Sequence, residues 1–289
     1  MDKEQVNHSF PWDGSELVLN EYKKDNIKIE NTGHKTSKAI IFFSSNGLYY
    51  PNNEESFKKS VIEKNRYEFE NISKDPMIQN EFELIIYVRD IYKQWCVNGI
   101  NERINTIEKL RDYLMEITNG YEITTCGCSS GGYLATLLGN MLDADKIFNL
   151  SGQFYLWDEL SVAPYLFDNK DNEEKSKYYD ITKYIKSCYF IYPARAKSDI
   201  FQCSFVKDNN LVKRLPINSD SHGSTVSPDC YKYLFAMTNE ELDCFFNKFK
   251  DKEMVTRREI DACLLPLSTR IKRFPKNFLK KIVKFLKSK

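Results

Sequence analysis

Histidine is scarce in this sequence, with only three among 289 residues, at His8, His34 and His222. A site that needs an imidazole base therefore has few candidates. Long apolar runs are absent too, since no stretch approaches the roughly 20 apolar residues of a membrane span. The beginning of the chain, 1–5, is charged and no apolar run follows it, which predicts no signal peptide.

Metal-binding patterns are also lacking. The eight cysteines are scattered, and the closest pair, Cys126 and Cys128, has neither the spacing nor the second ligand pair of a zinc site. A chain of this size does not need disulfides to stabilise it, so reduced thiols and a cytoplasmic location are expected. We expect no metal and no cofactor.

Acidic residues are missing from 270–289, where nine residues are Lys or Arg. The remaining 269 residues carry 33 basic and 41 acidic groups, a net charge of about −8. An acidic body of this kind argues against a nucleic-acid-binding surface. We therefore expect one folded domain over 1–269, followed by a basic tail over 270–289.

The apolar pattern predicts an α/β fold. Short apolar runs that alternate with helical patterns are typical of β-α-β units, and so predict a mostly parallel central sheet with helices on both faces. The expected strands are 16–22 and 26–30 as an antiparallel start, then 38–45, 82–88, 121–128, 146–150, 188–192 and 211–216. The expected helices are 54–72, 100–117, one beginning at residue 130, and 228–249.

One segment, 154–187, interrupts this alternation. It is rich in aromatic and charged residues. Two interpretations stay open for it, a small lid inserted over a site or a plain surface excursion of helix and loop.

The sequence Gly127-Cys128-Ser129-Ser130-Gly131 lies between a predicted strand and a predicted helix. The Gly-x-Ser-x-Gly pattern is typical of a sharp turn that exposes a serine, because glycine tolerates the strained backbone and the close contacts of such a turn. A serine hydroxyl is a weak nucleophile that needs a neighbouring base. Ser129 is therefore a candidate nucleophile that requires a histidine.

His222 is the best candidate for that base, because it lies in a turn-rich loop after the last predicted strand. His8 and His34 lie in polar segments that favour a surface position. A carboxylate should orient the imidazole. Asp199, in the loop after strand 188–192, is the favoured acid, and Asp220 is the competitor, although it is only two residues from the histidine.

With this serine motif and the order Ser129, Asp199, His222, the chain resembles the α/β-hydrolase family over about residues 15–250. The resemblance implies an eight-stranded sheet and serine attack on an acyl carbonyl. It also implies an oxyanion hole, the pair of backbone N–H groups that binds the developing negative charge. Its expected donors are the N–H groups of Ser130 and Leu48, with Gly47 as the alternative to Leu48.

Two loops at the expected sheet edge are candidate substrate contacts. The first contains Asn46, Gly47 and Tyr49, and the second contains Arg89 and Trp95. Guanidinium and aromatic groups suit polar, anionic or sugar ligands. A structural ion pair between Arg89 and its neighbour Asp90 is the alternative. These stretches are also similar to uncharacterised hydrolase-like proteins of bacterial surface-polysaccharide production.

The tail 276–289 has apolar and lysine residues that would separate onto opposite faces of a helix. Such a segment can bind an anionic membrane peripherally, from the cytoplasmic side, or pack its apolar face on the body.

We therefore expect a serine acyl hydrolase of the esterase kind, acting on a small-molecule or glycan ester. The alternatives are an acyltransferase of surface-polysaccharide production and a non-catalytic binding protein with the same fold at the membrane.

Overall fold

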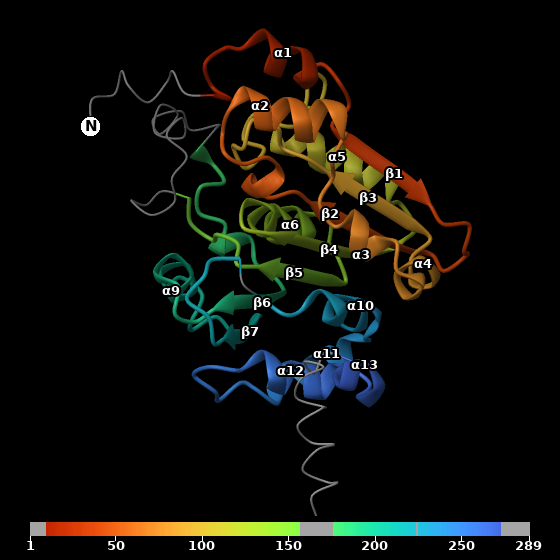
Figure 1. The fold of residues 1–289 in the computed structure, drawn as a ribbon, viewed down its shortest axis with the longest axis vertical. Helices are drawn as coiled ribbons and strands as arrows, with labels where there is room; N and C mark the ends of the chain where they lie inside the picture. The colour runs from red at the N-terminus through yellow and green to blue at the C-terminus, as the bar shows by residue number, and fades with distance from the viewer. Residues whose placement is uncertain (1–9, 157–175, 224, 273–289) are drawn as a thin grey trace, which may run out of the picture.

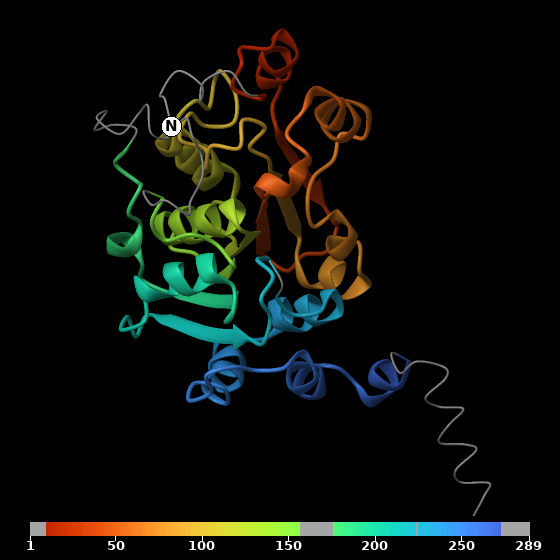
Figure 2. The same ribbon diagram turned by 60° about the vertical axis from the view of Figure 1, so that its left-hand side comes forward.

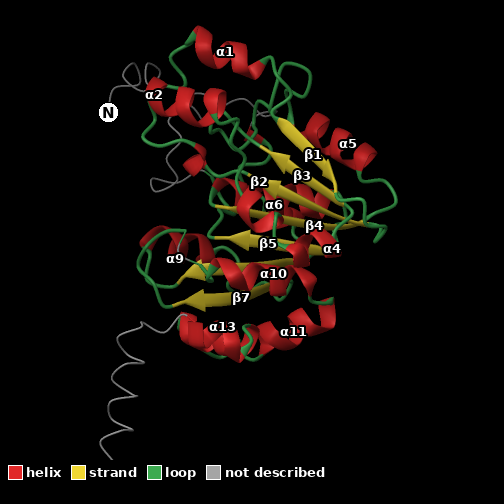
Figure 3. Ribbon diagram, turned by 45° about the vertical axis from the view of Figure 1, so that its right-hand side comes forward, coloured by secondary structure: helices red, strands yellow, loops and turns green. Residues whose placement is uncertain are grey.

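The computed structural model describes residues 10–156, 176–223 and 225–272. In these ranges it contains one seven-stranded sheet in the order β1-β3-β2-β4-β5-β6-β7 (Figure 1). Only β1 is antiparallel to its neighbour, and Figure 3 shows its arrow pointing against the others. The strands are β1 (Ile27–Asn31), β2 (Lys38–Phe43), β3 (Leu84–Val88), β4 (Glu122–Cys128), β5 (Lys146–Leu150), β6 (Cys188–Pro193) and β7 (Val212–Ile217). The predicted fold class is confirmed.

Each face of the sheet is covered by a separate apolar core. Alternate residues of β2 point to opposite faces, so Ile41 and Phe43 belong to one core while Ile40 and Phe42 belong to the other. The first core includes residues of α5 (Ile107–Ile117), α6 (Ser130–Met141) and α9 (Lys197–Ser204). The second includes residues of α4 (Pro76–Glu81), α10 (Pro228–Ala236), α11 (Asn239–Asn247) and α12 (Arg257–Leu264). Helices therefore lie on both faces.

The two edges of the sheet carry different elements. Beside β1 lie α1 (Glu16–Tyr22) and α2 (Glu54–Phe57), whose apolar residues join Leu48, Tyr49 and Ile91 in a third, smaller cluster (Figure 1). At the β7 edge, Figure 2 shows the C-terminal helices in blue, ending with α13 (Leu267–Lys272). The third cluster packs the loops that follow β2 and β3 against the body.

The expected strand over 16–22 is wrong, because this segment forms helix α1. Its apolar residues Leu17, Val18 and Tyr22 pack together onto the third cluster, as one side of a helix does. The sheet therefore has seven strands in the described ranges, not the eight that the family resemblance implies. The strand expected at 26–30 is confirmed as β1.

Three expected helices are shorter or divided. The segment 54–72 contains α2, a π-helical stretch (Lys58–Glu63) and α3 (Glu70–Ser73), separated by an irregular segment at 64–69. Helix α5 begins only after Thr106, whose hydroxyl accepts a hydrogen bond from the Lys109 N–H. The segment 228–249 divides at Thr238, which caps α11. Apolar periodicity alone did not reveal these side-chain caps.

The central part of the predicted lid, 157–175, and most of the tail, 273–289, lie outside the described residues. The residues that flank the first gap are part of the core, since Phe154, Leu156, Tyr178 and Tyr179 are buried. Before the second of these segments, α13 runs across the predicted boundary between the folded domain, 1–269, and the tail, 270–289. No helix in the described ranges is both long and apolar enough to cross a membrane.

Candidate active site

The serine turn joins β4 to α6. Ser129 adopts φ 54° and ψ −121°, a strained combination for a residue with a side chain. Two glycines permit the close contacts around it. A Cβ on Gly127 would lie 2.1 Å from the Gly131 carbonyl oxygen, and a Cβ on Gly131 would lie 2.2 Å from that of Phe43. The Gly-x-Ser-x-Gly spacing therefore has a direct steric cause.

Two segments far along the chain meet this serine. His222 Nε2 lies 2.9 Å from Ser129 Oγ, and His222 Nδ1 lies 2.8 Å from Asp199 Oδ2. Asp199 is buried, with 1% of its surface exposed, whereas 42% of the His222 side chain is exposed. In this geometry an imidazole can take the proton of a serine hydroxyl while the carboxylate fixes its tautomer.

The chain has the α/β-hydrolase fold. Its mostly parallel sheet with an antiparallel first strand, the helices on both faces, and the sharp turn at Ser129 between β4 and α6 define that fold. Of the two candidate acids, Asp199 is the one bonded to the histidine, whereas Asp220 is exposed.

The acid is supported by the helix that carries it. Asp199 lies in the first turn of α9, and Ser198 Oγ donates to its Oδ2 at 3.1 Å. One turn later, Gln202 Oε1 accepts hydrogen bonds from the N–H groups of Phe154 and Tyr155, at 2.7 and 3.0 Å. These bonds tie α9 to the chain that follows β5, next to the serine strand. Gln202 did not emerge from the sequence, which contains no local signal for this contact.

Two neighbouring groups have shifted pKa values. The hydrogen bond that His222 Nδ1–H donates to the Asp199 carboxylate raises the pKa of His222 above its usual value. Burial, together with the negative charges of Glu68 and Asp199, raises the pKa of the Cys128 thiol to about 12. Cys128 is therefore a neutral thiol near neutral pH, the less reactive form of a cysteine.

The loop after β2 forms a short 3₁₀ helix, η2 (Asn46–Leu48), beside the serine turn. Ser130 Oγ donates to Asn46 Oδ1 at 3.1 Å, which joins this loop to the start of α6. The expected donor Leu48 is wrong, because its N–H already donates to the Ser45 carbonyl at 3.1 Å. The alternative, Gly47, donates to Ser45 Oγ at 2.9 Å.

From Ser44 to Leu48, one N–H group has no acceptor within the described ranges. The N–H of Ser44 donates to the Val88 carbonyl and that of Ser45 to Glu68 Oε2. Within the described ranges, the Asn46 N–H has no acceptor, and neither has the Ser130 N–H. Asn46 was expected as a substrate contact and not as an oxyanion donor. The signal lay in its place as the first residue of a helical turn, where N–H groups lack partners.

Three of the predicted substrate contacts are structural residues instead. Tyr49 is fully buried and its hydroxyl donates to the Ile91 carbonyl at 2.6 Å. Trp95 is buried, and its Nε1 donates to Gln153 Oε1 at 3.1 Å. Arg89 is 3% exposed and donates to Asn26 and Asn65, so its guanidinium has no surface left for a substrate.

The alternative for Arg89, an ion pair with Asp90, is not formed among the described residues. The Asp90 carboxylate accepts backbone hydrogen bonds from Tyr92, Gln94 and Cys96. It therefore organises its own loop, and burial raises its pKa to about 6.

Comparison with known proteins leaves the activity open. No protein-family model and no curated protein matches the sequence. Among solved structures, the chain is similar to the capsule O-acetyltransferase of Neisseria meningitidis serogroup A, at 12% identity and a TM-score of 0.48, covering 78% of this chain and 90% of that one. A Staphylococcus aureus protein of unknown function is similar at 13% identity and a TM-score of 0.46, covering 78% of this chain and 93% of that one. Esterase B from Lactobacillus Rhamnosis is similar at 10% identity and a TM-score of 0.40, covering 86% of this chain and 92% of that one. Likeness at this level assigns no substrate.

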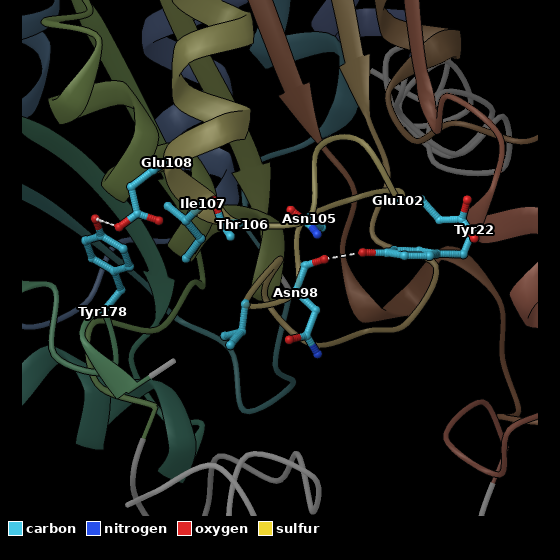
Figure 4. Close-up of a pocket in the computed structure, with 9 residues that line it drawn as sticks. Tyr22, Asn98, Glu102, Asn105, Thr106, Ile107, Glu108 and Tyr178 are labelled. Carbon is cyan, nitrogen blue, oxygen red and sulfur yellow. Dashed lines mark hydrogen bonds between the residues drawn. The ribbon is translucent and has the colours of Figure 1, made fainter. Parts of the chain in front are cut away.

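A separate cavity of about 460 Å³ lies beside the start of α5 (Figure 4). At one end Tyr178 donates to Glu108, and at the other Tyr22 donates to the carbonyl of Asn98. No predicted site residue lines this cavity.

In the described part of the chain, no group of three or more His, Cys, Asp or Glu side chains is placed to hold a metal ion.

Proposed function

We propose that this protein is a serine acyl hydrolase of the esterase type. Ser129 Oγ would bond to the carbonyl carbon of an ester while His222 Nε2 takes the hydroxyl proton. The same imidazolium would give that proton to the departing alcohol, which leaves an acyl group on Ser129. Water would then release the acid by the same proton transfers. The observation that carries the proposal is the pair of contacts, 2.9 and 2.8 Å, that links the strained serine through His222 to Asp199.

Two backbone groups are suited to stabilise the negative charge that develops on the carbonyl oxygen. They are the N–H groups of Ser130 and Asn46, which have no acceptor within the described ranges and belong to segments joined by the Ser130–Asn46 contact. N–H groups that point at such an oxygen are among the strongest contributions to acyl-transfer catalysis. We propose them as the oxyanion hole.

The proposal is tested by labelling the full-length wild-type protein with a fluorophosphonate and locating the adduct by mass spectrometry. We expect one adduct, on the peptide that contains Ser129. Hydrolysis of p-nitrophenyl esters of increasing chain length then defines the acyl group. Absence of an adduct at neutral and mildly alkaline pH, from folded protein, would instead support the non-catalytic binding protein.

The same acyl-enzyme would serve an acyltransferase if a sugar hydroxyl replaced water in the second step. The exposure of His222 favours this second candidate, because an imidazole with 42% of its side chain exposed is open to a large acceptor. Adding a polysaccharide to the ester assay separates the two. With p-nitrophenyl acetate as the ester, formation of acetylated glycan with less release of free acetate indicates transfer. Unchanged release of acetate indicates hydrolysis.

The proposed role of Asn46 predicts a large difference between two substitutions. Asn46→Pro removes the backbone N–H at the first position of a helical turn, where proline is tolerated, and the preceding Ser45 already has the extended backbone that proline requires (φ −85°, ψ 172°). We expect the maximal labelling rate to fall about 10²- to 10³-fold. Asn46→Ala keeps the N–H and loses only the contact with Ser130, so it should fall less than about tenfold. Equal rates in the two variants would exclude this donor.

We also propose that the basic segment 276–289 holds the protein at the cytoplasmic face of an anionic membrane. Each lysine near such a surface contributes about 1 kcal/mol. Sedimentation with phosphatidylserine-containing liposomes should capture the full chain but not a chain ending at Lys272, which retains α13. Equal capture of both chains would rule out the tail as the anchor.

A further inference from the structure

The loop that offers the Asn46 N–H is held by a carboxylate from elsewhere in the chain. Glu68 Oε2 accepts a hydrogen bond from the Ser45 N–H at 2.7 Å, and Glu68 Oε1 accepts one from Ser45 Oγ at 3.0 Å. Ser45 Oγ in turn accepts the Gly47 N–H at 2.9 Å. Glu68 thus fixes the residue before Asn46 directly and the residue after it through one hydroxyl.

The same short segment also holds the end of the loop. Arg66 Nη1 donates to the Leu48 carbonyl at 2.8 Å, and Arg66 Nη2 lies 4.0 Å from Glu68 Oε1. The 3₁₀ turn is therefore attached to residues 66–68 through the residue that precedes it, Ser45, and through its last residue, Leu48. We call Arg66 and Glu68 the loop clamp.

The buried Arg89 supports the clamp from behind. Its guanidinium donates to Asn65 Oδ1 at 2.9 Å and lies 4.6 Å from the centre of the Tyr67 ring. Because Arg89 directly follows β3, it connects the clamp to the sheet. This explains its burial better than the substrate contact expected from the sequence.

Glu68 is an unusual neighbour for a site that develops negative charge. Only 14% of its side chain is exposed, and burial raises its pKa, while the hydrogen bonds from Ser45 favour the ionised form. The fit around it is close, since a Cβ on Gly47 would lie 3.0 Å from Ser45 Oγ and 3.6 Å from Glu68 Oε1. A charge in this place opposes the reaction electrostatically, so a compensating role is required to explain it.

We propose that Glu68 is a positioning residue that holds the Asn46 N–H in place for the oxyanion. With both carboxylate oxygens occupied by Ser45, the Asn46 N–H is the only one from Ser44 to Leu48 without an acceptor in the described ranges. Without Glu68, Ser45 loses both acceptors and the turn can relax. The inference rests on the proposed function and adds a residue outside its catalytic set.

The test compares the fluorophosphonate labelling of wild type, Glu68→Ala, Glu68→Gln and Glu70→Gln. Concentration series separate the maximal labelling rate from the apparent binding constant of the probe. For Glu68→Ala we expect the maximal rate to fall about 10- to 100-fold with the binding constant unchanged, since a displaced donor costs part of what a deleted one costs. Glu68→Gln should lose less, because its amide oxygen can still accept the Ser45 N–H.

Glu70→Gln is the matched control. It removes a charge two residues away, from a carboxylate that binds Lys28 and not the loop, and it should label like wild type. If Glu68 acted only through its charge, both Glu68 variants would label faster than wild type, which would overturn the inference. Wild-type labelling rates in a Glu68→Ala protein of lowered melting temperature would also overturn it, because the role would then be purely structural.

Failure of the underlying function has a different signature, since the wild-type protein itself would not be labelled. Should Glu68→Ala not fold, Glu68→Gln and Ser45→Ala replace it. Ser45→Ala removes the hydroxyl that joins Glu68 to Gly47 and keeps the Ser45 N–H bond. A reduced maximal rate in both variants supports the inference, and unchanged rates in both contradict it.

Discussion

Ser129→Ala should abolish fluorophosphonate labelling and lower ester turnover by about 10⁶-fold, the scale seen when a serine nucleophile is removed from a complete triad. Alanine has the same Cβ as serine, so the strained turn at φ 54° keeps its shape and only the reacting oxygen is lost. Mass spectrometry of the labelled protein and a p-nitrophenyl ester assay measure the two effects. The melting temperature should stay close to that of the wild type.

Cys128→Ala is the control, because the thiol next to the serine is the other group that a reactive probe might modify. Since the pKa of Cys128 is raised to about 12, the thiol is neutral and this variant should retain labelling. Loss of labelling in Cys128→Ala, together with persistent labelling in Ser129→Ala, would assign the reaction to the Cys128 thiol and refute the proposed mechanism.

Asp199→Asn is expected to lower turnover about 10⁴-fold. An asparagine amide in place of the buried carboxylate would donate a hydrogen bond to His222 Nδ1. The imidazole proton then lies on Nε2, so Nε2 cannot accept the hydroxyl proton of Ser129. Asp220→Asn should retain nearly full activity, because Asp220 is exposed and His222 is bonded to Asp199. Comparing the two variants in the same ester assay decides between them, and a larger loss in Asp220→Asn would reverse the assignment.

The same pair predicts a pH dependence. In the proposed mechanism neutral His222 is the base, and Asp199 raises the pKa of His222 above 6.5, so the labelling rate should increase with pH through an inflection above 6.5. In Asp199→Asn the inflection should move to lower pH.

The contribution of His222 to folding stability changes with pH in the opposite direction to the labelling rate. The raised pKa favours folding below pH 6.5, and this contribution is lost as pH rises through the folded-state value.

Some features of this protein could be predicted because their causes are local in the sequence. The β4 strand, the glycines around Ser129 and helix α6 are contiguous, and the strain of that turn depends on its own residues. Buried strands such as β2 and β5 were also recognisable, since a short continuous apolar run suits a strand covered on both faces. The segment 16–22 was misassigned because seven residues fit either a strand or a helix until their packing partner is known.

The sequence by itself thus determined the fold class, the strained serine and a short choice of bases and acids. Only the tertiary structure shows that His222 bonds to Asp199 and not to Asp220, and that Arg89 is buried against Asn65. It also shows that the Leu48 N–H is occupied, while that of Asn46 has no acceptor in the described ranges. The physical reason is that each of these depends on which hydrogen-bonding groups are already occupied. The occupants come from segments distant in the chain, as Glu68 shows for the loop after β2.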